Sequence, residues 1–377
     1  MNSEVDIPAR IGTTGWVACL ALFALNAFAQ GPVAGDADLH VRVIDVGHGN
    51  AIVARMPAMD ESGERDHQYL VYDTGRWEDW ERQASLEAIE QVIPRSEEID
   101  LMVLSHADRD HIGGAPAILG AYQVSKIIRP GKKATVFQGD VVVWEEADQA
   151  IRAEGAEVLN LSEQAVSAGT RFQFGETTLT LVSGFSVPPE EWGELQPAHS
   201  RNSPSIVIRL DFADRSVLLT GDAIGCEHYE IDECDQTIAS EKYMLDNAGS
   251  VSIKSDVIVA PHHGSISSSS PEFIASVAPQ WVIFPSGHRY ELPRTAAVER
   301  YIRAGVLPSR ILGTDRGDHE GPKEWPQGRI EGCADVPFDD HIDIVITTAG
   351  DLKVGYSQPN PPPEESCKRP PIRPPAR

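Results

Sequence analysis

The feature that most constrains this chain is a short polar segment that directly follows an apolar run. Residues 101–104 are apolar, as in a buried strand, and they lead into Ser-His-Ala-Asp-Arg-Asp-His at 105–111. Two imidazoles and two carboxylates therefore fall within six residues. Side chains at a strand end can converge on one point, which a divalent metal ion requires, whereas an ordinary solvated loop rarely concentrates such residues. Gly113 and Gly114 then allow a tight entry into a helix.

Two further apolar segments end in residues of the same kind. Residues 216–220 close on Gly221 and Asp222, and residues 256–260 close on Pro261, His262 and His263. Taken alone, Asp222 is equally well explained as a helix N-cap or turn residue, and adjacent histidines are often polar loop residues. Because all three segments end buried strands, we expect them to form one site for two metal ions.

The rest of the chain alternates between strand-like and helix-like segments in two halves. We expect strands at 40–45, 51–56, 69–72, 101–104, 172–182, 205–210, 216–220, 256–260 and 281–284, a final hairpin at 341–348 and 352–356, and helices at 83–93, 113–122, 271–277 and 296–304. Two mixed α/β halves around one core predict two sheets packed face to face, with helices outside.

Both ends of the chain differ from this pattern. Residues 16–29 are apolar but shorter than the roughly 20 residues that span a bilayer. Ala27-Phe-Ala29 before Gln30 is typical of a cleavage site, so we expect residues 1–29 to be a signal peptide; a buried N-terminal helix is the alternative. Residues 358–377 are proline-rich and expected to be extended or disordered, which leaves 39–357 as the folded domain.

Charge and cysteine content fit an exported protein. The formal net charge of −25 disfavours tight non-specific binding to nucleic acid. Four cysteines follow the expected signal peptide. None of them forms the C-x-x-C pair that would indicate a zinc site. We expect a local disulfide between Cys226 and Cys234, and a second between Cys333 and Cys367, in a periplasmic or extracellular protein without an integral membrane region.

The order of the motifs resembles the metallo-β-lactamase superfamily. Asp73-Thr-Gly75 is followed by the His-x-Asp-x-Asp-His segment, by Gly221-Asp222 and by Pro261-His-His-Gly-Ser265. Within the superfamily, the chain is similar to the soluble domain of the ComEC-type competence DNA-uptake proteins. Residues 45–51 (DVGHGNA) stand where that subfamily has D-V-G-Q-G-D-A, residues 202–207 (NSPSIV) correspond to its N-x-x-S-L-V strand, and residues 314–317 (TDRG) to its T-D-R-x-G element.

The resemblance covers residues 39–318 and implies an αββα sandwich with the site at one edge of both sheets. It assigns the six metal ligands as His106 and Asp108 for one ion, Asp110, His111 and His263 for the other, and Asp222 as the bridge. It implies that His262 faces the substrate, although which of His262 and His263 is the ligand stays open. Four further residues are expected to support the ligands or to face the substrate: His48, Asp73, Asn202 and Ser205. Asp73 is expected to orient His106 or a neighbouring ligand.

Some positions depart from the commoner pattern of the superfamily. Asp108 stands where a histidine is usual, and position 202, near which the superfamily commonly has another histidine, is an asparagine. The resulting oxygen-rich set suits Mn²⁺ or Mg²⁺ beside Zn²⁺, so we expect two divalent ions, zinc or manganese. His48 replaces a glutamine, and His288 could compensate for a histidine missing from the subfamily's later G-H-P motif.

These residues predict an exported hydrolase with two metal ions. A hydroxide held beside Asp222 would attack phosphorus in a phosphodiester of nucleic acid or nucleotide, and Asp110 and His262 would assist as the other catalytic residues. Hydrolysis of lactones, other esters or β-lactams is the alternative reaction, and a metal-binding scaffold without catalysis is the alternative class. The natural substrate, protein partners and oligomeric state remain open.

Overall fold

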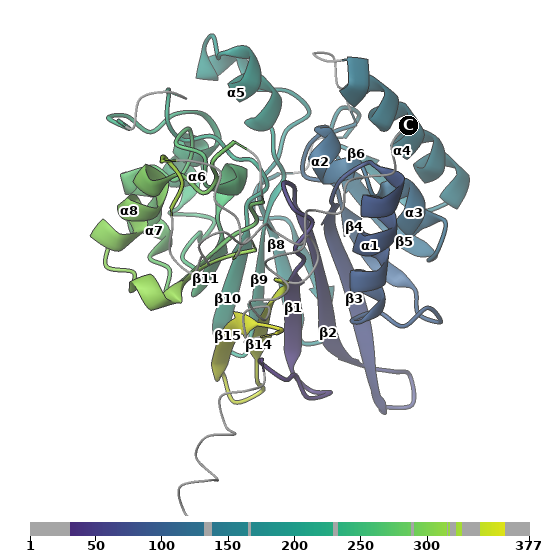
Figure 1. Cartoon of the computed structure of the whole chain (residues 1–377). Helices are drawn as coiled ribbons and strands as arrows, with labels where there is room; N and C mark the ends of the chain where they lie inside the picture. Colours follow the sequence, from purple (N-terminus) through teal and green to yellow (C-terminus); the bar gives the residue numbers. More distant parts are fainter. Residues whose placement is uncertain are drawn as a thin grey trace, which may run out of the picture.

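Two β-sheets face each other at the centre of the molecule, and helices cover both outer faces (Figure 1). The structure is a computed structural model that describes residues 31–131, 138–164, 167–228, 233–287, 290–314, 316, 322–325 and 340–358. The arrangement confirms the expected αββα sandwich. The expected signal peptide (1–29), the Cys333–Cys367 pair and His288 lie outside the described residues, as does the tail apart from Gln358.

The first sheet has eight strands in the order β15-β14-β1-β2-β3-β4-β5-β6. Their bounds are β1 Leu39–Val43, β2 Ala51–Met59, β3 Arg65–Thr74, β4 Ile99–Val103, β5 Val124–Arg129, β6 Glu157–Asn160, β14 Ile342–Ile346 and β15 Leu352–Tyr356. Strands β3 to β6 are parallel, so their carboxyl ends lie along one edge. The expected final hairpin is confirmed as β14 and β15, which pair with each other and join the sheet through β1.

The second sheet has seven strands in the order β13-β12-β11-β10-β9-β8-β7. Their bounds are β7 Arg171–Phe174, β8 Thr177–Ser183, β9 Val207–Phe212, β10 Arg215–Leu219, β11 Val257–Val259, β12 Trp281–Phe284 and β13 Ile311–Gly313. The strand expected at 172–182 is therefore two strands with a turn at Gly175. Strands β10 to β13 are parallel, so their carboxyl ends also share one edge.

Helices divide between the two outer faces. The helices are α1 Asp79–Glu90, α2 Arg109–Ile112, α3 Ala115–Leu119, α4 Gln138–Glu154, α5 Pro197–Asn202, α6 Ala239–Asn247, α7 Pro271–Val277 and α8 Thr295–Arg303, with short 3-10 turns η1 Glu190–Trp192, η2 Pro261–Gly264 and η3 Pro308–Arg310. Figure 1 shows α1, α3 and α4 beside the first sheet and α6, α7 and α8 beside the second. The single helix expected at 113–122 is wrong in its bounds, because α2 begins inside the polar segment and α3 is short.

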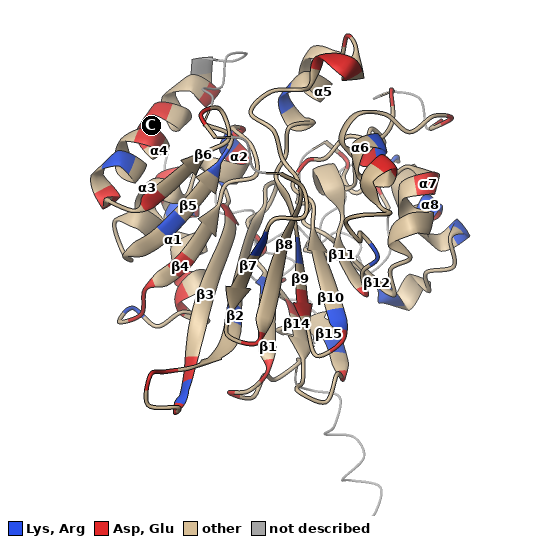
Figure 2. Ribbon diagram, turned by 180° about the vertical axis from the view of Figure 1, so that it is seen from behind, with Lys and Arg blue, Asp and Glu red and all other residues tan. Residues whose placement is uncertain are grey.

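The central strands are buried on both faces, which explains their continuous apolar character. In β2, Ile52 and Met56 pack between the sheets, whereas Ala51 and Val53 pack under the helices of the first sheet. Charged side chains lie mainly on the helices and at loops and strand ends (Figure 2). No helix in the described part of the chain is long and apolar enough to cross a membrane.

Candidate metal centre

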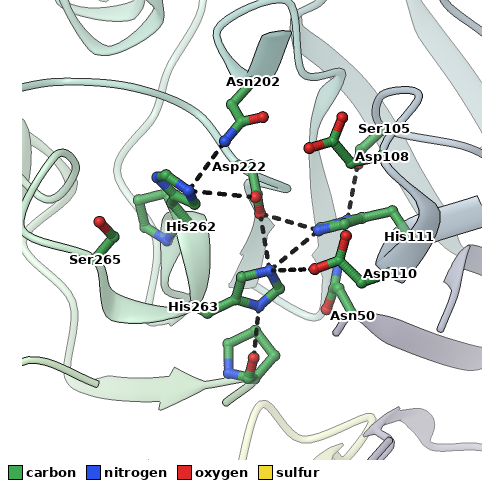
Figure 3. A network of polar contacts seen from close by, with 12 residues as sticks. Asn50, Ser105, Asp108, Asp110, His111, Asn202, Asp222, His262, His263 and Ser265 are labelled. Atoms are coloured by element: carbon green, nitrogen blue, oxygen red, sulfur yellow. Dashed lines mark hydrogen bonds and ion pairs between the residues drawn. The ribbon is translucent and has the colours of Figure 1, made fainter. Parts of the chain in front are cut away.

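The predicted ligands lie where strands of both sheets end, and Figure 3 shows five of the six, all except His106. β4 leads to His106 and α2, β10 leads to Asp222, and β11 leads to η2, which carries His262 and His263. Because β10 and β11 are adjacent and parallel, with Leu219 beside Val259, Asp222 and the two histidines emerge at the same edge. The site therefore takes side chains from both sheets.

Two groups of three side chains have donor atoms close enough to share a metal ion. One group is His106, His111 and Asp222, and the other is His48, Asp110 and His263; within each group, the donor atoms lie within 4.8 Å of one another. The groups adjoin, because His111 Nε2 lies 3.2 Å from His263 Nε2. The structure thus brings together five of the six predicted ligands and adds His48.

Asp222 belongs to the first group, and its Oδ1 also lies beside a donor of the second group. Its Oδ1 lies 3.2 Å from His111 Nε2 and 3.4 Å from His263 Nε2. Its Oδ2 lies 3.8 Å from both His106 Nε2 and His262 Nε2. This is the geometry expected of a carboxylate that serves two neighbouring cations.

Asp73 contacts the ring of His111 directly and reaches His106 only through Ser105. Its Oδ2 lies 2.7 Å from His111 Nδ1, and its two oxygens accept hydrogen bonds from the backbone N–H and the hydroxyl of Ser105 and from the side chain of Asn50. With Nδ1–H donated to Asp73, the lone pair of His111 Nε2 faces the cluster. Asp73 is therefore placed to orient His111, one of the predicted ligands.

The other two inward-facing histidines are oriented in the same manner. His263 Nδ1 donates to the Pro285 carbonyl at 2.7 Å. His106 Nδ1 lies 3.0 Å from Ser105 Oγ, and because that hydroxyl donates to Asp73, its oxygen accepts the His106 proton. Each ring therefore turns Nε2 toward the cluster, as metal-ligating histidines do.

His262 contacts neighbours that can change hydrogen-bonding role. Its Nε2 lies 3.0 Å from Asn202 Nδ2, and its Nδ1 lies 2.8 Å from Ser267 Oγ. Ser205 accepts the backbone N–H of Asp222 at 3.0 Å. Both His262 and His263 have left-handed backbones, with φ of 51° and 54°, a conformation that costs energy outside glycine and is concentrated at functional sites.

Asp108 lies outside both donor groups. Its Oδ2 pairs with Arg201 at 3.1 Å, and its Oδ1 is buried without a hydrogen-bond partner among the described residues. Burial raises the pKa of Asp108 to about 7, although Arg201 opposes the shift. A cation near its free oxygen would favour the ionised form.

Opposite charges stabilise each other inside the cluster. Burial raises the pKa of Asp222, but His111, His263 and His262 outweigh burial and hold the pKa well below its usual value. Burial lowers the pKa of His111, but Asp222 and Asp73 raise it well above the usual value. The negative charge of the carboxylates is balanced here by histidine protons. A bound metal ion could balance the same charge in place of those protons.

The donor set fits divalent metal ions. Imidazole nitrogens and carboxylate oxygens suit zinc and manganese alike. His106 Nε2 is also buried, and it has no hydrogen-bond partner among the described residues. Ligands of one ion at about 2.0–2.2 Å lie about 3–3.5 Å apart, which matches the separations among His111, His263 and Asp222.

A cavity of about 380 Å³ opens onto the cluster. Besides donor residues, its lining includes three arginines, two aromatic side chains and one further aspartate: Arg109, Arg201, Arg294, Trp77, Tyr290 and Asp140. Asp140 lies 3.4 Å from Arg109 and 3.7 Å from Arg201, and Arg109 lies 3.9 Å from the centre of the Trp77 ring. The guanidinium groups are therefore positioned before any substrate binds.

The expected Cys226–Cys234 disulfide is present. The backbone N–H groups of Gly225 and Cys226 donate to the Ser267 carbonyl at 3.0 and 2.9 Å. The disulfide therefore lies against the segment that contacts His262. Ser267 and Ser105 were not expected in the site; only the place of Ser105 beside His106 could have pointed to it.

The sandwich fold and its histidine and aspartate donors define a metal-dependent hydrolase in general terms. Residues 45–288 match the family model described as the metallo-beta-lactamase superfamily, and the chain belongs to this superfamily.

Two curated relatives are competence proteins of the ComEC type. The chain is 25% identical over 321 residues to ComE operon protein 3 of Bacillus subtilis (strain 168), which covers 82% of this chain and 35% of that protein. It is also 25% identical over 317 residues to Competence protein ComA of Neisseria gonorrhoeae, with the same coverage of 82% and 35%. The chain thus spans about a third of the length of these relatives. Among solved structures, the long form of RNase Z from yeast has a TM-score of 0.38 at 9% identity, covering 70% of this chain and 40% of that chain.

Proposed function

We propose that this protein is an exported phosphodiesterase or nuclease that uses two divalent metal ions. The observation that carries the proposal is the placement of Asp222, whose Oδ1 lies 3.2 Å from His111 Nε2 in one donor group and 3.4 Å from His263 Nε2 in the other. The proposed ligands are His106, Asp108, Asp110, His111, Asp222 and His263. Two metals at such a site lower the pKa of a bound water and neutralise charge on a phosphoryl group.

The surrounding side chains support handling of a phosphodiester. Arg109, Arg201 and Arg294 line the cavity, and arginine matches the planar geometry of phosphate oxygens. Resemblance to competence DNA-uptake proteins favours nucleic acid or nucleotide over other phosphodiesters. The Cys226–Cys234 disulfide supports a location outside the reducing cytoplasm.

His262 is the proposed proton donor to the leaving oxygen. Its neighbours allow either tautomer, because the Ser267 hydroxyl can donate or accept and the Asn202 amide has both a donor and an acceptor. A histidine that can exchange its proton in place suits general acid–base catalysis. Asp110 and Asp222 would keep the water and the metals in position.

The test uses mature protein that starts at Gln30, with metal content and cleavage of bis-nitrophenyl phosphate and DNA as readouts. We expect two metals per chain and metal-dependent cleavage, both lost in Asp110→Ala/His111→Ala. The matched control is Asp66→Ala/His67→Ala, which removes the same two residue types near the start of β3. Thr74 is at the opposite end of that strand, so the control should change neither readout.

Other outcomes would redirect or overturn the proposal. Bound metal with cleavage only of lactones, carboxylic esters or β-lactams would replace the phosphodiester substrate. Bound metal without any hydrolysis would indicate a metal-binding scaffold. A wild-type protein without metal would overturn the proposed function itself.

A further inference from the structure

We propose that His48 is a ligand of the metal ion held by Asp110 and His263, an inference that rests on the proposed function. His48 stands where the similar competence proteins have glutamine, so the assignment does not come from the family pattern. It would give this site one more imidazole nitrogen than the motif histidines supply.

The position of the ring carries the proposal. His48 Nε2 lies 3.1 Å from Asp110 Oδ2, and the donor atoms of His48, Asp110 and His263 all lie within 4.8 Å of one another. The His48 and His263 ring centres are 4.7 Å apart. The separation between His48 and Asp110 is within the range expected for two ligands of one ion, about 3–3.5 Å.

The fold gives His48 no other described polar role. The side chain is buried, and its Nδ1 has no hydrogen-bond partner among the described residues. The edge of the ring faces Tyr290, with ring centres 4.9 Å apart. Burial of an imidazole whose Nδ1 has no described partner is costly, and ligation of a metal by Nε2, beside its contact with Asp110, would offset that cost.

The backbone around His48 is fixed against the metal-site residues. Asn50 N donates to the Asp110 carbonyl at 3.1 Å, and Gly47 N donates to Asp45 Oδ1 at 2.9 Å. A Cβ at Gly49 would lie only 2.7 Å from the Asp110 carbonyl oxygen, so this turn packs directly on α2. The position of His48 relative to Asp110 is therefore set by backbone contacts.

His48 should bind the metal less tightly than His111 or His263. Those two rings donate their Nδ1 protons to Asp73 and the Pro285 carbonyl, which fixes each ring and makes Nε2 more basic. His48 lacks such an acceptor among the described residues. We therefore expect loss of His48 to weaken one metal site by about tenfold or more without abolishing binding.

The experiment measures metal affinity by competition with a chelator, using Zn²⁺ and Mn²⁺ on wild type, His48→Gln and the control His67→Gln. We expect one of the two metal equivalents to bind about tenfold or more weakly in His48→Gln, with the other within about twofold and His67→Gln unchanged. Wild-type affinities for both equivalents in a folded His48→Gln protein would overturn the assignment, even if turnover fell.

A second variant gives a positive signal that does not depend on loss of stability. His48→Cys offers a thiolate, and Co²⁺ or Cd²⁺ bound there should produce a sulfur-to-metal charge-transfer band absent from wild type. Absence of that band in a metal-loaded, folded variant would count against His48 as a ligand. Failure of wild type to bind metal would instead refute the proposed function.

Discussion

At the scale of single residues, Asp73 organises more of the site than any side chain outside the ligand set. Its carboxylate joins His111, Ser105 and Asn50, and Ser105 in turn accepts from His106. One buried group thus sets the orientation of two proposed ligands, and its left-handed backbone, with φ of 55°, is retained despite the strain.

Asp73→Asn should lower metal affinity by about 10- to 100-fold while the protein stays folded. His111 Nδ1 bonds Oδ2 and the backbone N–H of Ser105 bonds Oδ1, so the single acceptor oxygen of an amide cannot keep both bonds. Chelator competition measures the change. Asp100→Asn is the matched control, because Asp100 also accepts a backbone N–H, from Tyr69 at 2.7 Å, but lies in β4 away from the cluster. Equal loss of metal affinity in both variants would contradict this role for Asp73.

The sequence predicted which residues meet but not how they are paired. His106, Asp110, His111, Asp222 and the two adjacent histidines were found because each follows a buried strand. The partner of Asp73 depends on ring rotation and on the Ser105 hydroxyl, neither of which has a sequence pattern. The separation of Asp108 from the donor groups depends on Arg201, which is distant in sequence.

At the scale of elements, α6 supports the loop that follows η2. Glu241 in α6 accepts the backbone N–H groups of Ser269 and Ser270 at 2.6 and 2.8 Å. Ser267 in the same loop contacts His262. A carboxylate on one helix thus steadies a loop that reaches the candidate centre.

Glu241 should make stability depend on pH. Burial raises its pKa to about 7 from 4.5, although bonds from Ser270 and Ser269 oppose the shift. A folded-state pKa above the unfolded value means that stability is fully present below about pH 4.5 and is lost as pH rises through about 7. Relative to Glu241→Gln, the free energy of unfolding of wild type should fall by roughly 2–3 kcal/mol across this range. Urea titrations at several pH values measure it.

An exposed glutamate provides the control for that measurement. Glu87→Gln in α1 should leave the pH dependence of wild type unchanged. Parallel pH curves for wild type and Glu241→Gln would show that the buried carboxyl keeps its usual pKa.

Helix α4 shows what element prediction from the sequence missed. Its buried face is formed by Val143, Trp144, Ala147 and Ile151, whose spacing of three and four residues is the helical signal. That signal was overlooked because the intervening residues are mostly acidic or polar. Strands β5 and β6 and helix α6 were also not expected, whereas the long apolar strands beside the site were.

At the scale of the whole molecule, a formal net charge of −25 contrasts with a cavity whose lining includes three arginines. Long DNA should be repelled by the surface as a whole, and salt screens that repulsion over about 10 Å at 0.1 M.

We therefore expect kcat/KM for long DNA to rise with ionic strength from low salt to about 0.2 M, while kcat/KM for bis-nitrophenyl phosphate changes little. Proteins that bind DNA through a basic surface behave in the opposite way, because salt weakens phosphate contacts. Initial rates on both substrates over a sodium chloride series measure the ratio. A steep fall for DNA would reveal a basic binding surface that dominates the net charge.

The pairing of β1 with β14 also has a consequence for the order in which the protein can form. β1 is near the start of the described chain, yet one of its two neighbours in the sheet lies about 300 residues later. During synthesis, one edge of β1 must stay unpaired until β14 has left the ribosome. The first sheet therefore cannot be completed beside β1, its earliest strand, until β14 has been made, and the unpaired edge of β1 stays open to other contacts throughout that interval.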